Sequence, residues 1–320
     1  MMVPLILGVL VVVGLALTAN PRALARSLRD FDLWLLVPVL ALSVLNYGLR
    51  ALRWEYYLRR LGATLAPGRG LAIFLVGFVL SVTPGRAGEL GKAWLVRELG
   101  GGRAMRVVSA VLAERVTDVL GTIVLIGFGA LPLPGGPWIA AACLAGVVAV
   151  VVLLTWRRGA ELVFAILRRM PVMGSRVPHL VEMYDRLREL LSPGLAVGAI
   201  LVATVAWAAE GLGFWLVVRN YAPKAGFLLA VFNYTAASIL GGLSMLPGGL
   251  GAAEGSLAAL LHEQGLTAAD ASSITLVIRA ATLWFSVLFG VVALPFVARW
   301  LAARESPGIN ARATPNRKAG

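Results

Sequence analysis

Cysteine, histidine and acidic side chains are all scarce in this chain of 320 residues. The single cysteine, Cys143, lies in an apolar run, so no disulfide can form within the chain. The two histidines, His179 and His262, have no partner at the spacing of metal ligands. The short glycine runs match neither a P-loop nor a dinucleotide-binding motif. We therefore expect no metal site, no cofactor and no set of catalytic residues.

Apolar side chains are present in large excess. Hydrophobic residues make up 59% of the chain and charged residues only 14%, with a mean hydropathy of +0.84. A soluble domain is about 25% charged and fills its cores with fewer apolar residues. Lipid is the natural solvent for the surplus, so the composition indicates an integral membrane protein. The excess of 29 basic over 16 acidic residues then follows from the positive-inside rule, and no nucleic-acid partner is expected.

Several apolar stretches reach the roughly 20 residues that a spanning helix needs. They are 2–19, 33–52, 108–131, 137–155, 195–218 and 272–298. Two further stretches, 71–83 and 226–246, each lead through Pro-Gly into a shorter helical segment, at 87–98 and 250–262. We interpret each pair as a re-entrant hairpin, because broken backbone is tolerated in a membrane where protein or water surrounds it. The predicted fold is an all-α integral membrane protein with about six spanning helices and two re-entrant helical hairpins.

The basic residues predict the orientation in the membrane. With the N-terminus in the cytoplasm, most of them fall on the cytoplasmic side, Arg50, Arg53 and Lys92 included, and Arg115 and Arg279 lie within the membrane. We therefore expect a multi-pass protein of the cytoplasmic (inner) membrane with both termini in the cytoplasm.

The chain reads as a single transmembrane domain over 1–303. The loop at 156–192 mixes apolar residues with arginines, so it is either an interfacial helix on the anionic inner leaflet or only a charged topology anchor. The segment 304–320 is polar and rich in Pro and Gly, which predicts a disordered cytoplasmic tail.

An internal repeat is the most informative feature of the sequence. Residues 80–89 read LSVTPGRAGE and residues 243–254 read LSMLPGGLGAAE. Each motif is followed by an arginine at membrane depth, Arg115 in the first case and Arg279 in the second. Repeat 1 covers about 31–131 and repeat 2 about 194–300. Corresponding spans run in opposite directions, which predicts the inverted repeat of transporters whose broken helices meet near the midplane.

The repeated Pro-Gly motif favours a site for an anion. A helix N-terminus exposes unpaired N–H groups and the positive end of a dipole, and glycine permits a tight turn and close approach of a ligand. The simpler alternative is that Pro-Gly only turns the hairpins. The candidate residues are Pro84, Gly85, Arg86, Pro247, Gly248 and Gly249.

The intramembrane arginines are further candidates, because a charge at bilayer depth faces a partner or a wet cavity. Arg115 and Asp118 share one helical face, and we expect Glu114 to point elsewhere. This pair is either an internal clamp or a fork for a lipid phosphate. Arg279 has no acid nearby in sequence, which makes it the stronger candidate for ligand contact, unless Glu254 or Glu210 supplies a partner.

The intramembrane acids have more than one possible role. Glu89 and Glu254 take related places in the two hairpins, where they cap a helix, pair with an arginine or carry protons during transport. Glu210 lies in the apolar stretch 195–218 and should face the interior of the protein.

Four segments resemble the flippase-like transmembrane family, which includes the membrane region of bacterial lysylphosphatidylglycerol synthases (multiple peptide resistance factors). They are RALRW at 50–54, TPGRAGE at 83–89, AERVTD at 113–118 and LPGGLGAAE at 246–254, and the resemblance extends over about residues 5–300. It places the family's motif residues at Pro84, Gly85, Glu89, Glu114, Arg115, Asp118, Pro247, Gly248, Gly249 and Glu254. Since the sequence ends soon after the last helix, we expect a member without the soluble synthase domain.

The resemblance and the repeat together predict a lipid flippase. Its partner would be an anionic or zwitterionic phospholipid, or a polyprenyl-phosphate lipid, which crosses a polar cavity while its tails stay in the membrane. Two alternatives remain open: a membrane-embedded transferase acting on polyprenyl-phosphate-linked sugars, and a non-transporting partner of another membrane enzyme.

Overall fold

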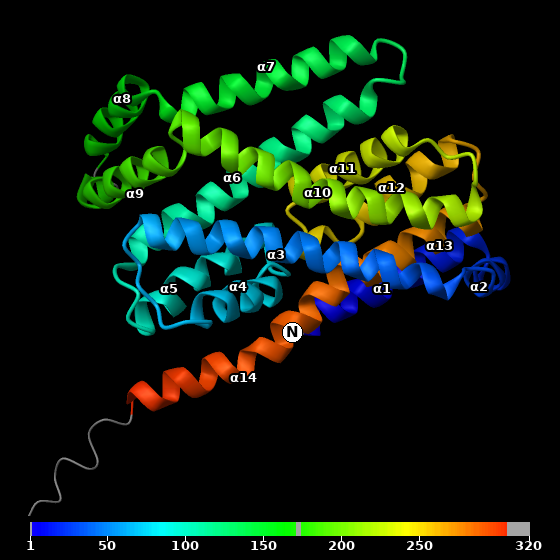
Figure 1. The fold of residues 1–320 in the computed structure, drawn as a ribbon, viewed down its shortest axis with the longest axis horizontal. Coiled ribbons are helices and arrows are strands. Elements are labelled where there is room, and N and C mark those ends of the chain that lie inside the picture. The colour runs from blue at the N-terminus through cyan, green and yellow to red at the C-terminus, as the bar shows by residue number, and fades with distance from the viewer. Residues whose placement is uncertain (1, 171–173, 306–320) are drawn as a thin grey trace, which may run out of the picture.

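The computed structural model describes residues 2–170 and 174–305, and over these ranges it contains helices and turns but no β-strand (Figure 1). The all-α prediction is confirmed. The predicted tail lies outside the described residues from residue 306 onward. At the other end, α1 (Met2–Ala19) and α2 (Pro21–Arg29) are separated by Asn20 and bent by 101°.

Two runs of helices share the same order of elements. In each run a long helix is followed by a shorter apolar helix, a turn that begins at Pro-Gly, a short helix and a second long helix. The first run is α3 (Leu36–Arg60, preceded by the turn η1, Leu33–Leu35), α4 (Arg69–Leu80), η2 (Pro84–Leu90), α5 (Gly91–Glu98) and α6 (Ala104–Ala130). The second is α10 (Pro193–Tyr221), α11 (Phe227–Leu243), η4 (Pro247–Gly249), α12 (Ala252–Glu263), α13 (Ala268–Arg279), the π-helical turn η5 (Ala280–Trp284) and α14 (Phe285–Glu305).

Candidate membrane spans are fewer than the six predicted. Within the described ranges, four segments are long and apolar enough, and a fifth is added if the bent pair α1–α2 counts as one span. Helix α6 has the length, but Glu114, Arg115 and Asp118 interrupt its apolar sequence. The predicted crossing by α6 therefore depends on how these charges are compensated inside the protein. The four segments are Leu33–Arg60, Gly136–Thr155, Pro193–Tyr221 and Ala268–Arg304.

The two runs pack against each other as well as within themselves. Helix α3 packs along α10, α11 packs against α6, and α14 packs against α4. The last long helix of each run thus contacts the hairpin of the other run. One buried cluster forms around Trp54 and Phe74 and also takes in Val297 of α14, and a second forms around Phe214 and Ile274. The same side-chain contacts that fill the core therefore also hold the two runs together.

The two Pro-Gly turns meet in the middle of the molecule. In Figure 1, α4 and α5 occupy one half of the long axis, whereas α11 and α12 occupy the other. The backbone N–H of Gly85 donates a hydrogen bond to the carbonyl of Met245 over 3.0 Å. We name residues 83–89 the first elbow and residues 245–251 the second elbow. Direct contact between the elbows is the arrangement that the repeat requires.

The central loop forms two helices after α7 (Gly136–Thr155). They are α8 (Arg157–Arg168) and α9 (Val177–Leu190), connected through the turn η3 (Gly174–Arg176). Helix α9 packs on α6, whereas α8 has no buried residue and exposes the apolar side chains of Leu162, Val163 and Ile166. An exposed apolar stripe beside arginines is typical of an interfacial helix, and this assignment stays a prediction.

Candidate functional site

Both elbows use the same backbone conformation. Gly85 and Arg86 of the first elbow have φ of 59° and 57°, and Gly248 and Gly249 of the second have 63° and 68°. Residues with a side chain rarely adopt this left-handed region, whereas glycine does so freely. Arg86 is therefore the unusual member of the set, because it occupies a position that glycine fills in the second elbow.

A network of ion pairs surrounds Asp118 on α6. Arg53 of α3 donates a short hydrogen bond to Asp118 Oδ1, and the Nη2 atoms of Arg50 and Arg115 both lie 3.3 Å from Oδ2. Arg53 and Asp118 are almost fully buried, and the side chain of Arg115 is 23% exposed. Three guanidinium groups on one carboxylate compensate its charge and tie α3 to α6.

Glu114 extends this network towards the first elbow. Its Oε2 lies 2.6 Å from Nζ of Lys92 on α5, and its Oε1 lies 3.4 Å from Nη2 of Arg115. Arg115 Nε in turn lies 3.1 Å from Glu89 Oε2, which joins α6 to the first elbow. We name these seven residues the charged cluster; its cations are Arg50, Arg53, Lys92 and Arg115, and its anions are Glu89, Glu114 and Asp118.

One expectation from the sequence is wrong at this cluster. Glu114 does not point away from Arg115, since the neighbouring side chains bend towards each other across a buried space shared with Lys92. Arg50, Arg53 and Lys92, which the sequence assigned to the cytoplasmic side, are 10% exposed or less and pair with carboxylates. Their place on the cytoplasmic side stays a prediction.

Arg279, at the end of α13, has partners within its own run. Its Nε donates to Glu254 Oε1 over 2.5 Å and its Nη2 donates to the carbonyl of Gly248 over 3.1 Å. Glu254 Oε2 also accepts from the backbone N–H of Gly251, which caps α12. Arg279 is thus not the unpartnered cation that its sequence surroundings suggested, and Glu254 is both a cap and an ion-pair partner.

Glu210 faces the interior, as expected, but it differs from the other intramembrane acids. It accepts a hydrogen bond of 2.6 Å from the hydroxyl of Tyr234 on α11, and no basic side chain of the described ranges lies within ion-pair distance. Nearby, the hydroxyl of Tyr47 donates to the carbonyl of Thr282 in the π-helical turn. Glu210 and Tyr47 place polar groups against the same space, which lies between the two runs.

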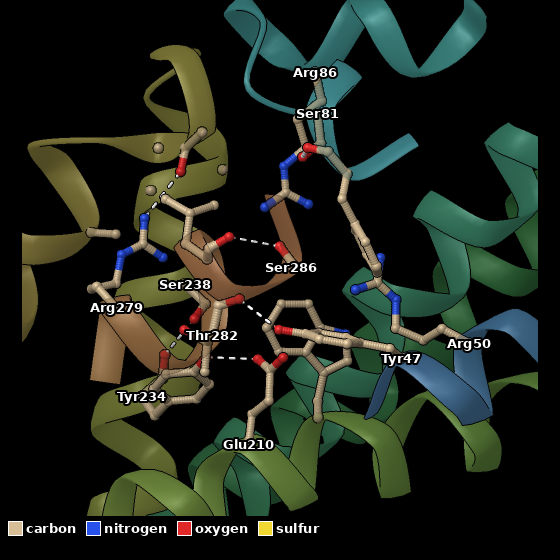
Figure 2. Close-up of a pocket in the computed structure, with 18 of the residues that line it drawn as sticks. Tyr47, Arg50, Ser81, Arg86, Glu210, Tyr234, Ser238, Arg279, Thr282 and Ser286 are labelled. Atoms are coloured by element: carbon tan, nitrogen blue, oxygen red, sulfur yellow. Dashed lines mark hydrogen bonds between the residues drawn. The ribbon is translucent and has the colours of Figure 1, made fainter. Parts of the chain in front are cut away.

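A polar cavity lies where the runs meet, next to the elbows (Figure 2). It has a volume of about 70 Å³ and is lined by Arg50, Arg86, Glu210 and Arg279, together with the hydroxyl groups of Tyr47 and Ser238. Figure 2 shows Arg86 extending into this space from the first elbow. Within the described residues its guanidinium makes no hydrogen bond and no ion pair, unlike those of Arg115 and Arg279.

An apolar groove lies beside the polar cavity. Its volume is about 400 Å³, and it runs between α6, α11 and the first elbow. Its rim includes Val119, Leu243 and Leu90, which are 50%, 73% and 45% exposed. Five residues line both spaces, which therefore lie side by side: Arg86, Glu89, Trp207, Ser238 and Gly242.

The structure brings most of the sequence-predicted site residues to these two spaces. Those that line the cavity are Arg86, Glu89, Gly248, Gly249 and Arg279. Those that line the groove are Gly85, Arg86, Glu89, Arg115 and Asp118. Pro84, Pro247 and Glu254 line neither, and serve the turn or its cap. Sequence reasoning missed Arg50, Trp207 and Ser238 as lining residues; the motif RALRW, which starts at Arg50, was the one signal that could have found the first of them.

A helical, multi-pass membrane protein with a charged site buried between two helical runs is the class that these observations define. Residues 5–290 match the family described as the lysylphosphatidylglycerol synthase TM region. The chain belongs to this family, as its motifs suggested. Two similar proteins of Methanothermobacter thermautotrophicus are both named UPF0104 membrane protein. One is 26% identical over 310 residues, covering 89% of this chain and 90% of the relative. The other is 22% identical over 318 residues, covering 91% and 94%.

Proposed function

We propose that this protein is a flippase that moves a phosphate-bearing lipid between the leaflets of the membrane. The observation that carries the proposal is a cation-lined cavity beside an apolar groove with an exposed rim, the two sharing five lining residues. A lipid has the same division between a polar head group and apolar tails. The head group would occupy the cavity while the tails lie in the groove and reach the surrounding bilayer past Leu243.

The charge around the cavity favours an anionic head group. The charged cluster holds four cations against three carboxylates, and Arg86 adds a further cation at the point where cavity and groove join. The Arg86 guanidinium is half-buried and has no carboxylate partner within the described ranges, and its planar donors suit a phosphate. Arg86 is thus the residue to which we assign the main contact with the lipid phosphate, with Arg50 and Arg279 lining the same space.

We further infer that the two runs are an inverted repeat and that the two Pro-Gly hairpins are re-entrant. Three features support this: the shared order of elements, the paired left-handed residues in each elbow, and the packing of each last helix on the other run's hairpin. In this arrangement the cavity is exposed alternately to each side when one run rocks against the other. The elbows, in contact through Gly85 and Met245, are the pivot.

Leaflet exchange in liposomes tests the proposal. Tail-labelled phosphatidylglycerol, phosphatidic acid and phosphatidylcholine are each incorporated with the purified full chain, and a membrane-impermeant reductant bleaches the label in the outer leaflet. The protein should accelerate loss of the protected signal for the two anionic lipids, and R86Q should slow this at least tenfold. R59Q, which changes an exposed arginine of α3, is the matched control. No acceleration for any of the lipids would contradict the proposal, and a chemically altered lipid would favour a transferase.

A further inference from the structure

Glu210 stands apart from the other acids around the cavity. Glu89, Glu114, Asp118 and Glu254 each have a basic partner within 3.1 Å. Glu210 is 6% exposed, and within the described ranges its side chain has a hydrogen bond only from the hydroxyl of Tyr234, at 2.6 Å. A buried carboxylate without a cation is held less firmly in its charged form than one inside an ion pair. Glu210 is therefore the acid at this site that can exchange a proton without breaking a salt bridge.

The Glu210 carboxylate and the lipid phosphate are attracted by the same basic side chains. Each long helix that packs on α10 carries a polar or charged group that acts on Glu210. The first elbow borders the same cavity and contributes two more. These groups are Tyr47 and Arg50 of α3, Asp118 of α6, Tyr234 of α11, Arg279 of α13, and Arg86 and Glu89 of the first elbow. Arg50 and Arg279 act on Glu210 electrostatically and also line the space that we assign to the phosphate. Carboxylate and phosphate thus draw on the same positive charges.

We propose that Glu210 carries one proton for each anionic lipid that crosses, an inference that rests on the flippase function above. A phosphate entering the cavity places negative charge beside the Glu210 carboxylate and favours its protonated form. By thermodynamic reciprocity, a proton on Glu210 strengthens binding of the phosphate by the same factor. The proton comes from water on the side where the lipid enters and returns to water on the side where it leaves. For a singly charged head group the transfer is electrically neutral.

The same set of groups explains why Glu210 can hold the proton at this place. The hydroxyl of Tyr234 donates to one carboxylate oxygen in the charged form and can stay there when the other oxygen is protonated. Within the cavity, the ion pairs of the charged cluster and the pair of Arg279 with Glu254 stay in place in either state. The change of charge is then confined to Glu210 and the phosphate, because the proton and the lipid arrive and leave together.

A pH gradient across proteoliposomes tests this inference. Tail-labelled phosphatidylglycerol is the probe, and its distribution between leaflets is measured with and without a difference of one pH unit. For coupling of one proton to one singly charged lipid, the label should accumulate in the leaflet facing the less acidic side, approaching about tenfold. A dye inside the vesicles should report proton uptake with the lipid. Protein-free vesicles give the passive response, which is subtracted.

Variants separate a proton carrier from a structural residue. At equilibrium, the lipid distribution that E210Q gives should ignore the gradient, whatever its rate of exchange; Y234F removes the hydroxyl and should weaken the response. E263Q, at an exposed glutamate of α12, should behave as wild type. Wild-type exchange that proceeds without any response to the gradient would overturn the inference while leaving the flippase intact. If E210Q does not fold, the response of the wild-type protein to the pH gradient decides by itself whether the inference holds. Absence of all exchange, in contrast, would overturn the flippase function and the inference with it.

Discussion

Arg86 and Gly249 have the same left-handed backbone conformation, with φ of 57° and 68°, each at the second residue after the proline of its elbow. Glycine adopts this conformation freely, whereas a residue with a side chain is destabilised by about 1–2 kcal/mol. The first elbow is therefore locally strained at Arg86, whose guanidinium lies in the cavity. At the matching position the second elbow has Gly249, which adopts this conformation without strain and has no side chain.

Replacing Arg86 by glycine should separate stability from binding. R86G relieves the left-handed strain and removes an unpaired cation, so we expect the free energy of unfolding in detergent to rise by about 1 kcal/mol. Binding of phosphatidylglycerol, measured as thermal stabilisation by the lipid, should be lost. R86K keeps the charge and should retain part of this stabilisation. A variant R86G that binds the lipid as wild type does would refute the role of Arg86.

The second elbow should tolerate no side chain at Gly249. A Cβ atom at this position would lie 3.0 Å from the backbone of Gly241, in addition to the unfavourable φ. We expect G249A to lower the free energy of unfolding by about 1–3 kcal/mol. G255A is the matched control, since a Cβ there meets nothing within 4 Å in the helix α12, and it should be neutral or slightly stabilising. Equal unfolding curves for the two variants would mean that the elbow is looser than described.

Asp118 should be the residue whose loss harms stability most. D118N leaves Arg53, already with two unsatisfied nitrogen atoms, in a buried position without a carboxylate, and it removes the pairs with Arg50 and Arg115. Breaking a buried ion pair from one side costs about 3–5 kcal/mol. Thermal unfolding in detergent should show a large drop relative to E263Q, which alters an exposed carboxylate. If both variants unfold alike, the charged cluster does not support the fold.

Gly242 offers a way to block the path without disturbing the core. It lines both the cavity and the groove, and a Cβ there meets nothing within 4 Å. The side chain of G242L should fill the passage between them and reduce leaflet exchange at least tenfold, with unchanged thermal stability. G146L, at an exposed glycine of α7 with the same free space, should leave exchange unaffected. Normal exchange by G242L would place the lipid path elsewhere.

The positions of the helices could be read from the sequence, because apolar runs and Pro-Gly breaks are local features. The stretch 71–83 corresponds to α4 and 226–246 to α11, within a few residues. The elbows could be recognised for the same reason, since their motif occurs twice. The sequence also predicted that the two elbows meet, and they are in contact through Gly85 and Met245.

Of the charged cluster, the sequence offered the pairing of Arg115 with Asp118 and of Glu89 with an arginine as alternatives, and both pairs are present. The other pairs could not be predicted, because their partners lie far apart in the chain. Arg53 and Asp118 are separated by 65 residues, and Lys92 and Glu114 by 22. At the ends of apolar runs, Arg50 and Arg53 look like the basic flanks that set topology, and only packing of α3 on α6 turns them inward. For Arg279 the sequence left Glu254 and Glu210 open as partners, and the structure pairs it with Glu254, 25 residues away across the break between α12 and α13.

The most direct test of the central claim is a density map of the full chain in a bilayer disc that contains phosphatidylglycerol. We predict an elongated density along the groove between α6 and α11, ending in a phosphate within hydrogen-bond distance of the Arg86 guanidinium. Maps in which the cavity beside the elbows holds no head group, while lipid occupies only the outer surface, would contradict the account.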